Sequence, residues 1–319
     1  VTDMSLMFSG AVAFDQNIGN WQVGNVGNFE YMFTGVTLST ENYDKLLIGW
    51  NSLPYLQGEI YFDAGNSHYC GAITAKSDII NNWSWSISDG GIDCSDYFIT
   101  NWDTSISGTP GDNTITIPTA GDGYNYTVNW GDNTISENVT GNISHTYDSP
   151  GIYIVKIFGD FPRICFENSD VNNRMRIISV ENWGTNEWTS MHSAFYGCSN
   201  LEILATDAPD LSGVTDMSQM FQWNHQLNSN LNSWNVSTIT NMEGIFKYGS
   251  GYNLVISNWN VSNVTNMKEA FADYATFSSD ISAWDVGQVT DMSRMFYHNV
   301  YSNSYFNQDL SNWDVGNVT

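Results

Sequence analysis

Two short segments of the sequence bring aromatic and histidine side chains together at equivalent places. Trp223 and His225 follow one Met-Phe pair, and Tyr297 and His298 follow another. Aromatic rings can pack on sugars or apolar side chains, and an imidazole can donate or accept a hydrogen bond. Exposed side chains of this kind could bind a ligand, whereas buried packing is an equal alternative for Trp223. We therefore predict Trp223, His225, Tyr297 and His298 as binding residues.

The sequence contains no pattern typical of a catalytic site. It lacks a G-x-S-x-G elbow, an H-E-x-x-H zinc motif and a Walker loop. Carboxylates are abundant, so pairs at catalytic distance arise by chance and identify nothing. The five histidines are scattered along the chain: His68, His145, His192, His225 and His298. We therefore expect no enzyme activity and predict no catalytic residue, and for His145 we favour a structural hydrogen bond.

Polar residues that recur before each Met-Phe stretch could hold calcium or cap a turn. They are Asp216, Asn241, Asn266 and Asp291, each 25 residues after the last. Columns of side-chain oxygens suit Ca²⁺, yet no EF-hand loop or calcium-binding nonapeptide repeat is present. Asp and Asn are also preferred capping residues. We favour capping, and we predict no metal-binding residue and no cofactor, with calcium left open.

A repeat of 25 residues must position these side chains. Its markers are Phe221, Phe246, Phe271 and Phe296, with Met217, Met242, Met267 and Met292, and with Trp234, Trp259 and Trp284. One such unit cannot bury an apolar face alone, so stacked copies forming a solenoid are expected. Met and Phe lie four residues apart, which places them on one face of a short helical turn. We expect rows of Phe, Met and Trp in the core, with the Val of W-x-V and the Val or Ile of V-T pointing inward.

The same unit occurs at both ends of the sequence. Residues Val1–Phe8 match Val289–Phe296 at seven of eight positions, and the sequence ends on the lead-in to a further unit. We therefore expect an excerpt of a longer protein that begins and ends within repeat arrays.

The residues between the arrays lack the 25-residue period. Apolar spacing predicts helices over 43–50 and 72–83 and a strand over 59–64, which together suit a cap on the last coil. Further strands are predicted over 113–117, 124–130, 151–157 and 175–180. The first three are short, alternate in polarity and are separated by turns, which indicates a small β-sandwich.

The chain has four cysteines, at Cys70, Cys94, Cys165 and Cys198. They lack the close Cys-x-x-Cys spacing of a zinc site. Cys70 and Cys94 flank one segment, and Cys165 and Cys198 flank another, so we predict two disulfides with this sequential pairing. Four cysteines allow three pairings, and free buried thiols are the alternative.

The chain is strongly acidic, with 34 acidic and 9 basic residues and a formal charge of -25. Nucleic acid and anionic membrane surfaces are therefore poor partners. No apolar run approaches the ~20 residues of a membrane span, and the acidity fits a secreted protein kept soluble by charge. Four basic residues gather at one junction: Lys156, Arg163, Arg174 and Arg176. We favour an electrostatic clamp on an acidic neighbour, with an acidic-glycan site as the alternative.

The repeat resembles the BspA-like leucine-rich-repeat surface proteins of bacteria. The strings V-T-x-M-x-x-M-F and N-W-D-V-S/G-N-V-T carry the resemblance, and Phe306–Val315 is a close match. Phe14–Trp21 departs slightly from it, and Ser193–Leu201 resembles the related A-F-x-x-C-x-x-L repeat. The resemblance covers roughly half of the chain and implies a leucine-rich-repeat-like fold, but it identifies no ligand.

The middle of the chain resembles PKD domains. Val128–Asn133 contains W-G-D-N, where the usual string is W-G-D-G, and His145–Val155 contains H-T-Y. Domains of this family are usually spacers or interaction modules on cell-surface proteins. Both resemblances therefore imply export and surface display, and neither implies catalysis.

These observations predict a mainly β chain in which leucine-rich-repeat-like solenoid segments, with 25-residue coils and short helical turns, flank a PKD-like β-sandwich. The expected parts are 1–50, the end of a repeat solenoid; 51–96, its C-terminal cap; 97–160, the sandwich; 161–213, an N-terminal cap and irregular first coil; and 214–319, the 25-residue repeat solenoid.

We expect a segment of a large secreted bacterial cell-surface adhesin. Its expected partners are host or environmental proteins or glycans and neighbouring modules of the same chain, with no nucleic acid and no membrane insertion in this segment. The alternative is a structural spacer, filament or stalk unit in a tandem surface array, without a ligand of its own. A spacer should expose only small polar residues, whereas an adhesin should expose a contiguous aromatic patch.

Overall fold

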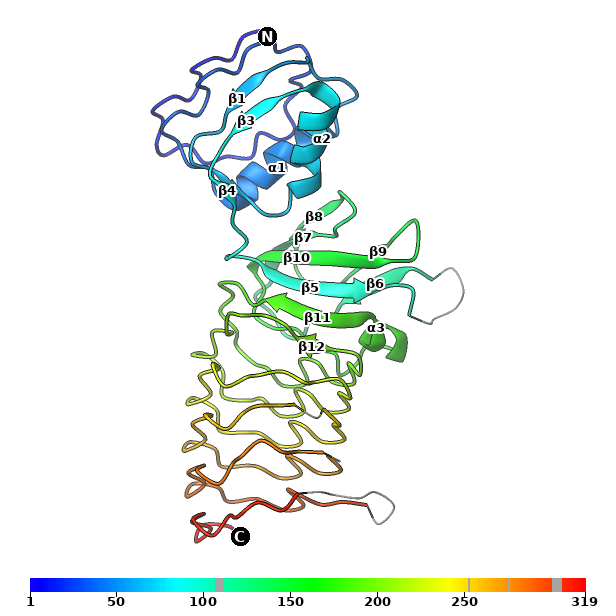
Figure 1. Ribbon diagram of the computed structural model, residues 1–319, viewed down its shortest axis with the longest axis vertical. Coiled ribbons are helices and arrows are strands. Elements are labelled where there is room, and N and C mark those ends of the chain that lie inside the picture. The colour runs from blue at the N-terminus through cyan, green and yellow to red at the C-terminus, as the bar shows by residue number, and fades with distance from the viewer. Residues whose placement is uncertain (107–111, 252, 275, 300–305) are drawn as a thin grey trace. The chain divides into compact units, whose positions relative to one another are not determined.

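The computed structural model covers the whole chain and describes every residue except 107–111, 252, 275 and 300–305. The described part is mainly β, with few helices. It divides into two compact units, Val1–Asp96 (unit 1) and Tyr97–Thr319 (unit 2), as Figure 1 shows. Each unit has its own hydrophobic core.

Unit 1 contains the helices and the strand that apolar spacing predicted in this region. They are α1 (Thr40–Asn51), α2 (Ile73–Trp83) and β1 (Tyr61–Asp63). Two short parallel pairs complete the unit, β1 with β3 (Ser86–Ser88) and β2 (His68–Tyr69) with β4 (Gly91–Ile92). The rings of Phe29, Trp50 and Phe62 are fully buried and pack against one another, with centroids 5.3 to 5.9 Å apart.

The predicted Cys70–Cys94 disulfide is present in unit 1. It lies beside the start of α2, where the buried Asp44 carboxylate accepts hydrogen bonds from the backbone N–H groups of Cys70, Gly71 and Ala72 at 3.0, 2.6 and 2.9 Å. Hydrogen bonds to a carboxylate are stronger than neutral ones. The segment before α2 is therefore fixed both covalently and by charge.

A six-stranded sheet opens unit 2. Its order is β12-β11-β5-β10-β7-β8, formed by Glu202–Ile203, Ile177–Asn182, Phe98–Asp103, Ile152–Asp160, Asn125–Asn129 and Ile135–Val139. All neighbours are antiparallel except β11 and β12. β6 (Thr114–Ile117) and β9 (Ile143–Thr146) form a separate antiparallel pair.

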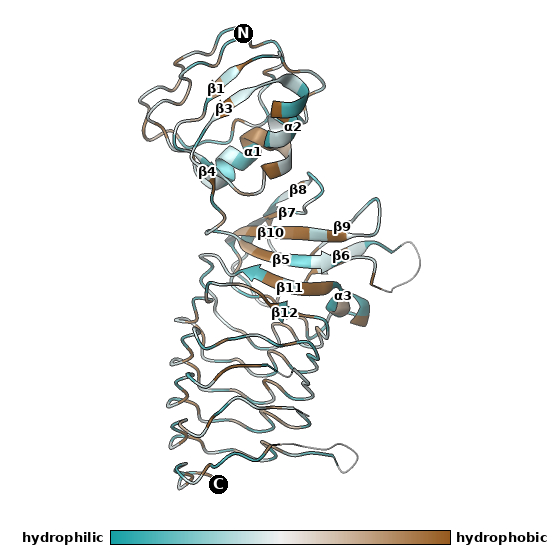
Figure 2. Cartoon of the chain, in the orientation of Figure 1, coloured by the Kyte–Doolittle hydropathy of each residue, from teal (hydrophilic) through white to brown (hydrophobic). Residues whose placement is uncertain are grey.

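The four strands predicted in this region are present as β6, β7, β10 and β11, and Figure 2 shows that β10 and β11 are largely hydrophobic. The last of them begins at Ile177, two residues later than predicted, because Val171–Arg176 forms the short helix α3. Strand β11 pairs with β5, so one sheet includes residues on both sides of position 160, and β12 carries the sheet into the repeat turns.

His145 makes the structural hydrogen bond that its sequence context predicts. Its Nε2 lies 2.7 Å from Asp132 Oδ2, and its ring stacks on Trp130 with centroids 4.7 Å apart. Tyr147 packs edge-on against the same imidazole and donates its hydroxyl to the Trp130 carbonyl at 2.9 Å. These contacts join the turn that follows β7 to β9 and the residue after it.

We call the segment Met217–Trp223 and its equivalents in the other repeats the repeat turns. Every second backbone N–H of one repeat turn donates to a carbonyl oxygen of the next. Met217, Gln219, Phe221 and Trp223 donate to the carbonyl oxygens of Asn241, Glu243, Ile245 and Lys247 at 2.8 to 3.0 Å. The intervening N–H groups close local turns, as from Met220 to the Met217 carbonyl at 3.2 Å. These two sets together pair the N–H groups of the turn, as a buried backbone requires.

The prediction of a short helical turn from Met217 to Phe221 is wrong. Gln219 has φ +57° and Trp223 has φ +65°, which is left-handed backbone that an α-helix does not contain. The turn instead directs alternate N–H groups at the neighbouring coil. Met217 and Phe221 both still point inward, at 0% and 1% exposure, so the predicted direction of these side chains is correct.

The predicted rows of core residues are present. Phe221, Phe246, Phe271 and Phe296 stack with ring centroids 5.6 to 5.8 Å apart. The repeat tryptophans Trp234, Trp259 and Trp284 are buried, as are Val236, Val261, Val286, Ile239, Val264 and Val289. Because each ring contacts the equivalent ring of the next turn, the turns share one continuous core.

The recurring Asp and Asn residues cap turns, as predicted. Asp216, Asn241, Asn266 and Asp291 each accept, through Oδ1, the backbone N–H of the residue two positions later at 2.8 to 3.1 Å. Asp280, Asp285, Asp309 and Asp314 do the same at other corners of the coils. Lys and Arg side chains cannot accept such a bond, so part of the acidity of the chain is structural.

The prediction of a Cys165–Cys198 disulfide is wrong. Both residues are free cysteines, and both are buried. Cys165 precedes α3, and its N–H bonds to the Pro118 carbonyl at 3.1 Å. Cys198 lies inside the first repeat turn, where its thiol is 3.9 Å from the Tyr196 carbonyl oxygen. Burial raises the pKa of the Cys198 thiol well above its usual range. The two thiols are thus packed by different elements, which sequential order along the chain could not reveal.

Candidate functional site

A cleft of about 350 Å³ opens on unit 2 where α3 meets the first two repeat turns. Helix α3 contributes Val171, Arg174 and Met175, and the turns contribute Tyr196, Gly197, Ser199, Trp223 and His225. Its walls combine apolar and aromatic side chains with one cation and one imidazole. Concave, mainly apolar surfaces with a few polar groups are the usual form of sites for small ligands.

Helix α3 is held firmly although it is short. The Asp170 side chain caps it by accepting the N–H groups of Asn172 and Asn173 at 2.9 and 3.0 Å. The buried Asn173 amide then accepts the N–H of Thr116 and donates to its carbonyl, both at 2.8 Å. Asn173 therefore bonds to β6 as a neighbouring strand would, and this fixes one wall of the cleft.

Trp223 forms the opposite wall and is 42% exposed. Its ring stacks on Tyr248 of the next turn, with centroids 3.9 Å apart and an interplanar angle of 21°. Its left-handed backbone disfavours a bulky side chain by roughly 1–2 kcal/mol. The equivalent residue of the preceding turn is Gly197, with φ +74°, which adopts this conformation without that cost.

Asn224 fixes the loop that carries Trp223 and His225. Its buried side-chain amide donates to the carbonyl oxygens of Cys198 and Leu201 at 2.9 and 3.2 Å. The neighbouring side chains therefore point outward, and the exposed His225 ring stands edge-on to Trp223 with centroids 6.3 Å apart. The loop thus presents an indole and an imidazole from a rigid base.

Arg174 supplies the cation of the cleft. Its Nε donates to the Phe166 carbonyl at 3.1 Å and its Nη2 to the Glu167 carbonyl at 2.5 Å. The guanidinium also lies over the ring of Tyr196, 4.9 Å from its centroid. A Cβ at Gly197 would lie 2.8 Å from Arg174 Cδ, so only glycine leaves room for this arrangement. Arg174 therefore holds backbone carbonyls, whereas Arg176 of the same basic group makes the expected contact with an acidic neighbour, 3.4 Å from Asp112 Oδ2.

The structure brings two of the four predicted binding residues, Trp223 and His225, into the cleft. Tyr297 and His298 lie on a later turn, because two intervening turns separate them from Trp223 along the ladder of backbone hydrogen bonds. Tyr297 is 47% exposed beneath Arg294, which is 5.5 Å from its ring centroid. His298 is mostly buried, and its Nε2 lies 3.0 Å from the Tyr274 carbonyl oxygen.

Sequence reasoning missed the α3 side of the cleft. Val171 and Met175 carry no distinguishing pattern, because they contribute only apolar surface. Arg174 was visible as one member of a basic cluster in an acidic chain, and Tyr196 as the aromatic residue after Phe195. The fold alone brings these two residues beside Trp223.

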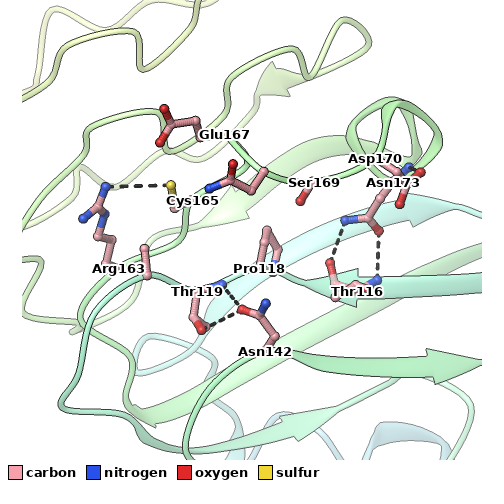
Figure 3. A pocket seen from close by; sticks show the side chains of 12 residues that line it. Thr116, Pro118, Thr119, Asn142, Arg163, Cys165, Glu167, Ser169, Asp170 and Asn173 are labelled. Atoms are coloured by element: carbon pink, nitrogen blue, oxygen red, sulfur yellow. Dashed lines mark hydrogen bonds between the residues drawn. The ribbon is translucent and has the colours of Figure 1, made fainter.

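A second, polar pocket of about 390 Å³ is lined partly by the segment that precedes α3 (Figure 3). Its polar groups largely satisfy one another: Asn142 Oδ1 accepts both the N–H and the hydroxyl of Thr119, at 2.7 and 2.8 Å. Arg163 Nη2 lies 3.7 Å from Cys165 Sγ and donates to the His192 carbonyl at 3.2 Å. No aromatic ring lines this pocket, so the cleft at Trp223 is the stronger candidate.

Among the described residues, no group of three or more His, Cys, Asp or Glu side chains is arranged to hold a metal ion. Likewise, in the part of the chain that the structure describes, no helix is both long and apolar enough to span a membrane.

The fold and the cleft define a mainly β repeat protein that presents a preformed surface site. Comparison with known proteins then places the chain in a family. It belongs to the family described as Mycoplasma protein of unknown function, DUF285, whose model matches residues 1–56, 164–271 and 215–319. The matched ranges include the repeat turns of both units and also α1, α3, β11 and β12. No curated protein and no solved structure matches the chain.

Proposed function

We propose that this chain is part of a bacterial cell-surface adhesin that binds a protein or glycan ligand in the cleft at Trp223. In this proposal the repeat turns form a leucine-rich-repeat-like solenoid of the BspA-like type, and β5 to β10 form a PKD-like domain that supports it. The protein is displayed outside the cell, and we expect no catalytic activity from it.

One observation carries the proposal: a large aromatic side chain, 42% exposed, lines a cleft at a position that the equivalent turn fills with glycine. An exposed ring in a concave site is available to a ligand, so we assign Trp223 a binding role. Its stacking on the half-buried Tyr248 extends the aromatic surface beside the cleft, in the direction that an adhesin needs. A spacer without a ligand would have no reason to keep this surface.

Two further observations support display outside the cell. The Cys70–Cys94 disulfide is of the kind that persists in oxidising compartments. The formal charge of -25 favours solubility and disfavours nucleic acid as a partner.

The test is binding of the full 319-residue chain to an array of glycans and matrix proteins, with calcium and with a chelator. We expect saturable binding that Trp223→Gly abolishes and Tyr297→Ala leaves intact. Tyr297 is the matched control because it is equally exposed but lies outside the cleft. A folded chain that binds nothing under either condition would favour the structural spacer, and binding that survives Trp223→Gly would remove the cleft from the proposal.

A further inference from the structure

We infer that the cleft binds a pyranose that carries a carboxylate, such as a uronic acid unit of an otherwise neutral glycan. This inference rests on the proposed function and names the class of ligand for the same site. It follows from the chemistry of the two walls, from the charge of the chain and from the size of the cleft.

The first wall is the indole of Trp223. One face of the ring is covered by Tyr248 and the side chain is still 42% exposed, so a flat aromatic surface remains for a ligand. The face of an aromatic ring is electron-rich. A pyranose ring presents a face of C–H groups with partial positive charge, which fits that surface without requiring hydrogen bonds from the indole. The adjacent Ser199 and His225 can bond to sugar hydroxyls.

The second wall is the guanidinium of Arg174. Its Nε and Nη2 bond to carbonyl oxygens, and among the described residues no carboxylate pairs with it and its Nη1 has no hydrogen bond. The nearby Glu167 carboxylate instead lies 3.7 Å from His192 Nε2. A guanidinium that is fixed in place and lacks an acidic partner is a good receptor for a carboxylate.

The charge of the chain limits what else could occupy the cleft. With 9 basic against 34 acidic residues, the chain repels a polyanion such as nucleic acid. A cationic ligand would in turn face Arg174 at close range. A mostly neutral ligand with one carboxylate avoids both penalties.

The size of the cleft fits a single ring. A volume of about 350 Å³ lies at the lower end of the range for ligand sites, which is about 300–1,000 Å³. The ligand is therefore one unit at the end or edge of a glycan. The neighbouring units would extend over the exposed repeat surface.

The experiment titrates the full chain with methyl glucuronide and with methyl glucoside, which differ only at C6, a carboxylate in the first and a hydroxymethyl group in the second. Binding is followed by nuclear magnetic resonance or calorimetry. We expect the glucuronide to bind at least about tenfold more tightly at low salt. Added salt should weaken the binding of the glucuronide alone, because only that ligand is charged.

Two variants assign the binding to the cleft. Trp223→Gly should abolish binding of both sugars without unfolding the chain, because glycine is native at the equivalent position 197. Arg174→Gln should make the two affinities equal. If Arg174→Gln unfolds the chain, the comparison of the two sugars with the native chain still decides the question.

The outcomes separate this inference from the proposed function. Equal binding of the two sugars, lost in Trp223→Gly, would leave an adhesin and overturn the acidic ligand. The same holds if neither sugar binds but an array ligand binds through Trp223. If nothing binds to the folded chain, both the inference and the proposed function fail.

Discussion

The repeat turns of unit 1 and those of unit 2 share one backbone pattern but differ in the side chains at one of its left-handed positions. In unit 1, Met4, Leu6, Phe8 and Gly10 donate to the carbonyl oxygens of Asn28, Glu30, Met32 and Thr34 at 2.9 to 3.0 Å, which is the ladder seen from Met217 to Trp223. The second left-handed position of the turn is glycine in unit 1, at Gly10 and Gly35, whereas successive turns of unit 2 have Gly197, Trp223, Tyr248 and Asp273 there. The backbone therefore belongs to the repeat, whereas the ligand site is added by side chains at a position that the fold leaves free.

The units also differ in how their turns are completed. Unit 1 adds α1 and α2 and a disulfide, whereas unit 2 joins its turns to a six-stranded sheet and keeps two free thiols. The following predictions test how far the common backbone sets stability and how far these additions do.

The largest effect is expected from the stacked phenylalanines, which both units contain. Phe271 is 2% exposed and lies between Phe246 and Phe296, with 5.6 Å between ring centroids on each side. Phe271→Ala should lower the free energy of unfolding by roughly 3–5 kcal/mol, and Phe33→Ala should do the same in unit 1. Urea unfolding measures both. An unchanged transition for either variant would show that the two cores are not equivalent.

The disulfide should have the next largest effect, and only in unit 1. Replacing Cys70 and Cys94 by Ala opens a link across 24 residues and should lower the free energy of unfolding of unit 1 by about 3 kcal/mol. Calorimetry with and without a reducing agent is the measurement. The transition of unit 2 should not move, because Cys165 and Cys198 are already reduced. A shift of both transitions would mean that the units unfold as one.

A smaller effect should follow from changing the left-handed glycine of unit 1. Gly35 has φ +75° and nothing lies within 4 Å of a Cβ built there, so only backbone conformation opposes a side chain. Gly35→Ala should therefore cost about 1 kcal/mol, and Gly35→Asn less, because Asn tolerates this backbone. Thermal unfolding checks the order. If the Gly35→Ala variant were as stable as the native chain, the backbone strain assigned to Trp223 would lose its basis.

The smallest effect concerns acid. The backbone N–H of Ser5 lowers the pKa of Asp3, and the Ser293 hydroxyl and N–H lower that of Asp291. A carboxylate with a lowered folded-state pKa stabilises the fold above its unfolded value of 3.8, and this contribution is lost as the pH falls below about 4.

Both units should therefore melt at lower temperature below about pH 4, and melting curves at several pH values measure this. Asp3→Asn and Asp291→Asn keep the turn and remove the charge, as Asn28 and Asn266 already do. Each variant should reduce the fall in melting temperature at low pH, and only in its own unit. A melting temperature that stays constant down to pH 2 would contradict the assignment.

The sequence predicted the parts of the fold that repeat. Inward Phe, Met, Trp and Val rows follow from the 25-residue period, because every turn must bury the same face against the next. The capping role of Asp216 and its equivalents follows from residue type and position. The backbone form of the turn could not be predicted in this way. The four-residue spacing of Met217 and Phe221 fits a helix as well as a turn with two left-handed residues.

By itself, then, the sequence determined the period, the core rows, the capping residues, the helices α1 and α2 and one disulfide, because each depends on local spacing or residue type. Tertiary structure decided the rest. It left Cys165 and Cys198 apart, paired β11 with β5, and set Arg174 beside Trp223. Those outcomes depend on contacts between residues distant in the chain, and such contacts are set only when the elements pack.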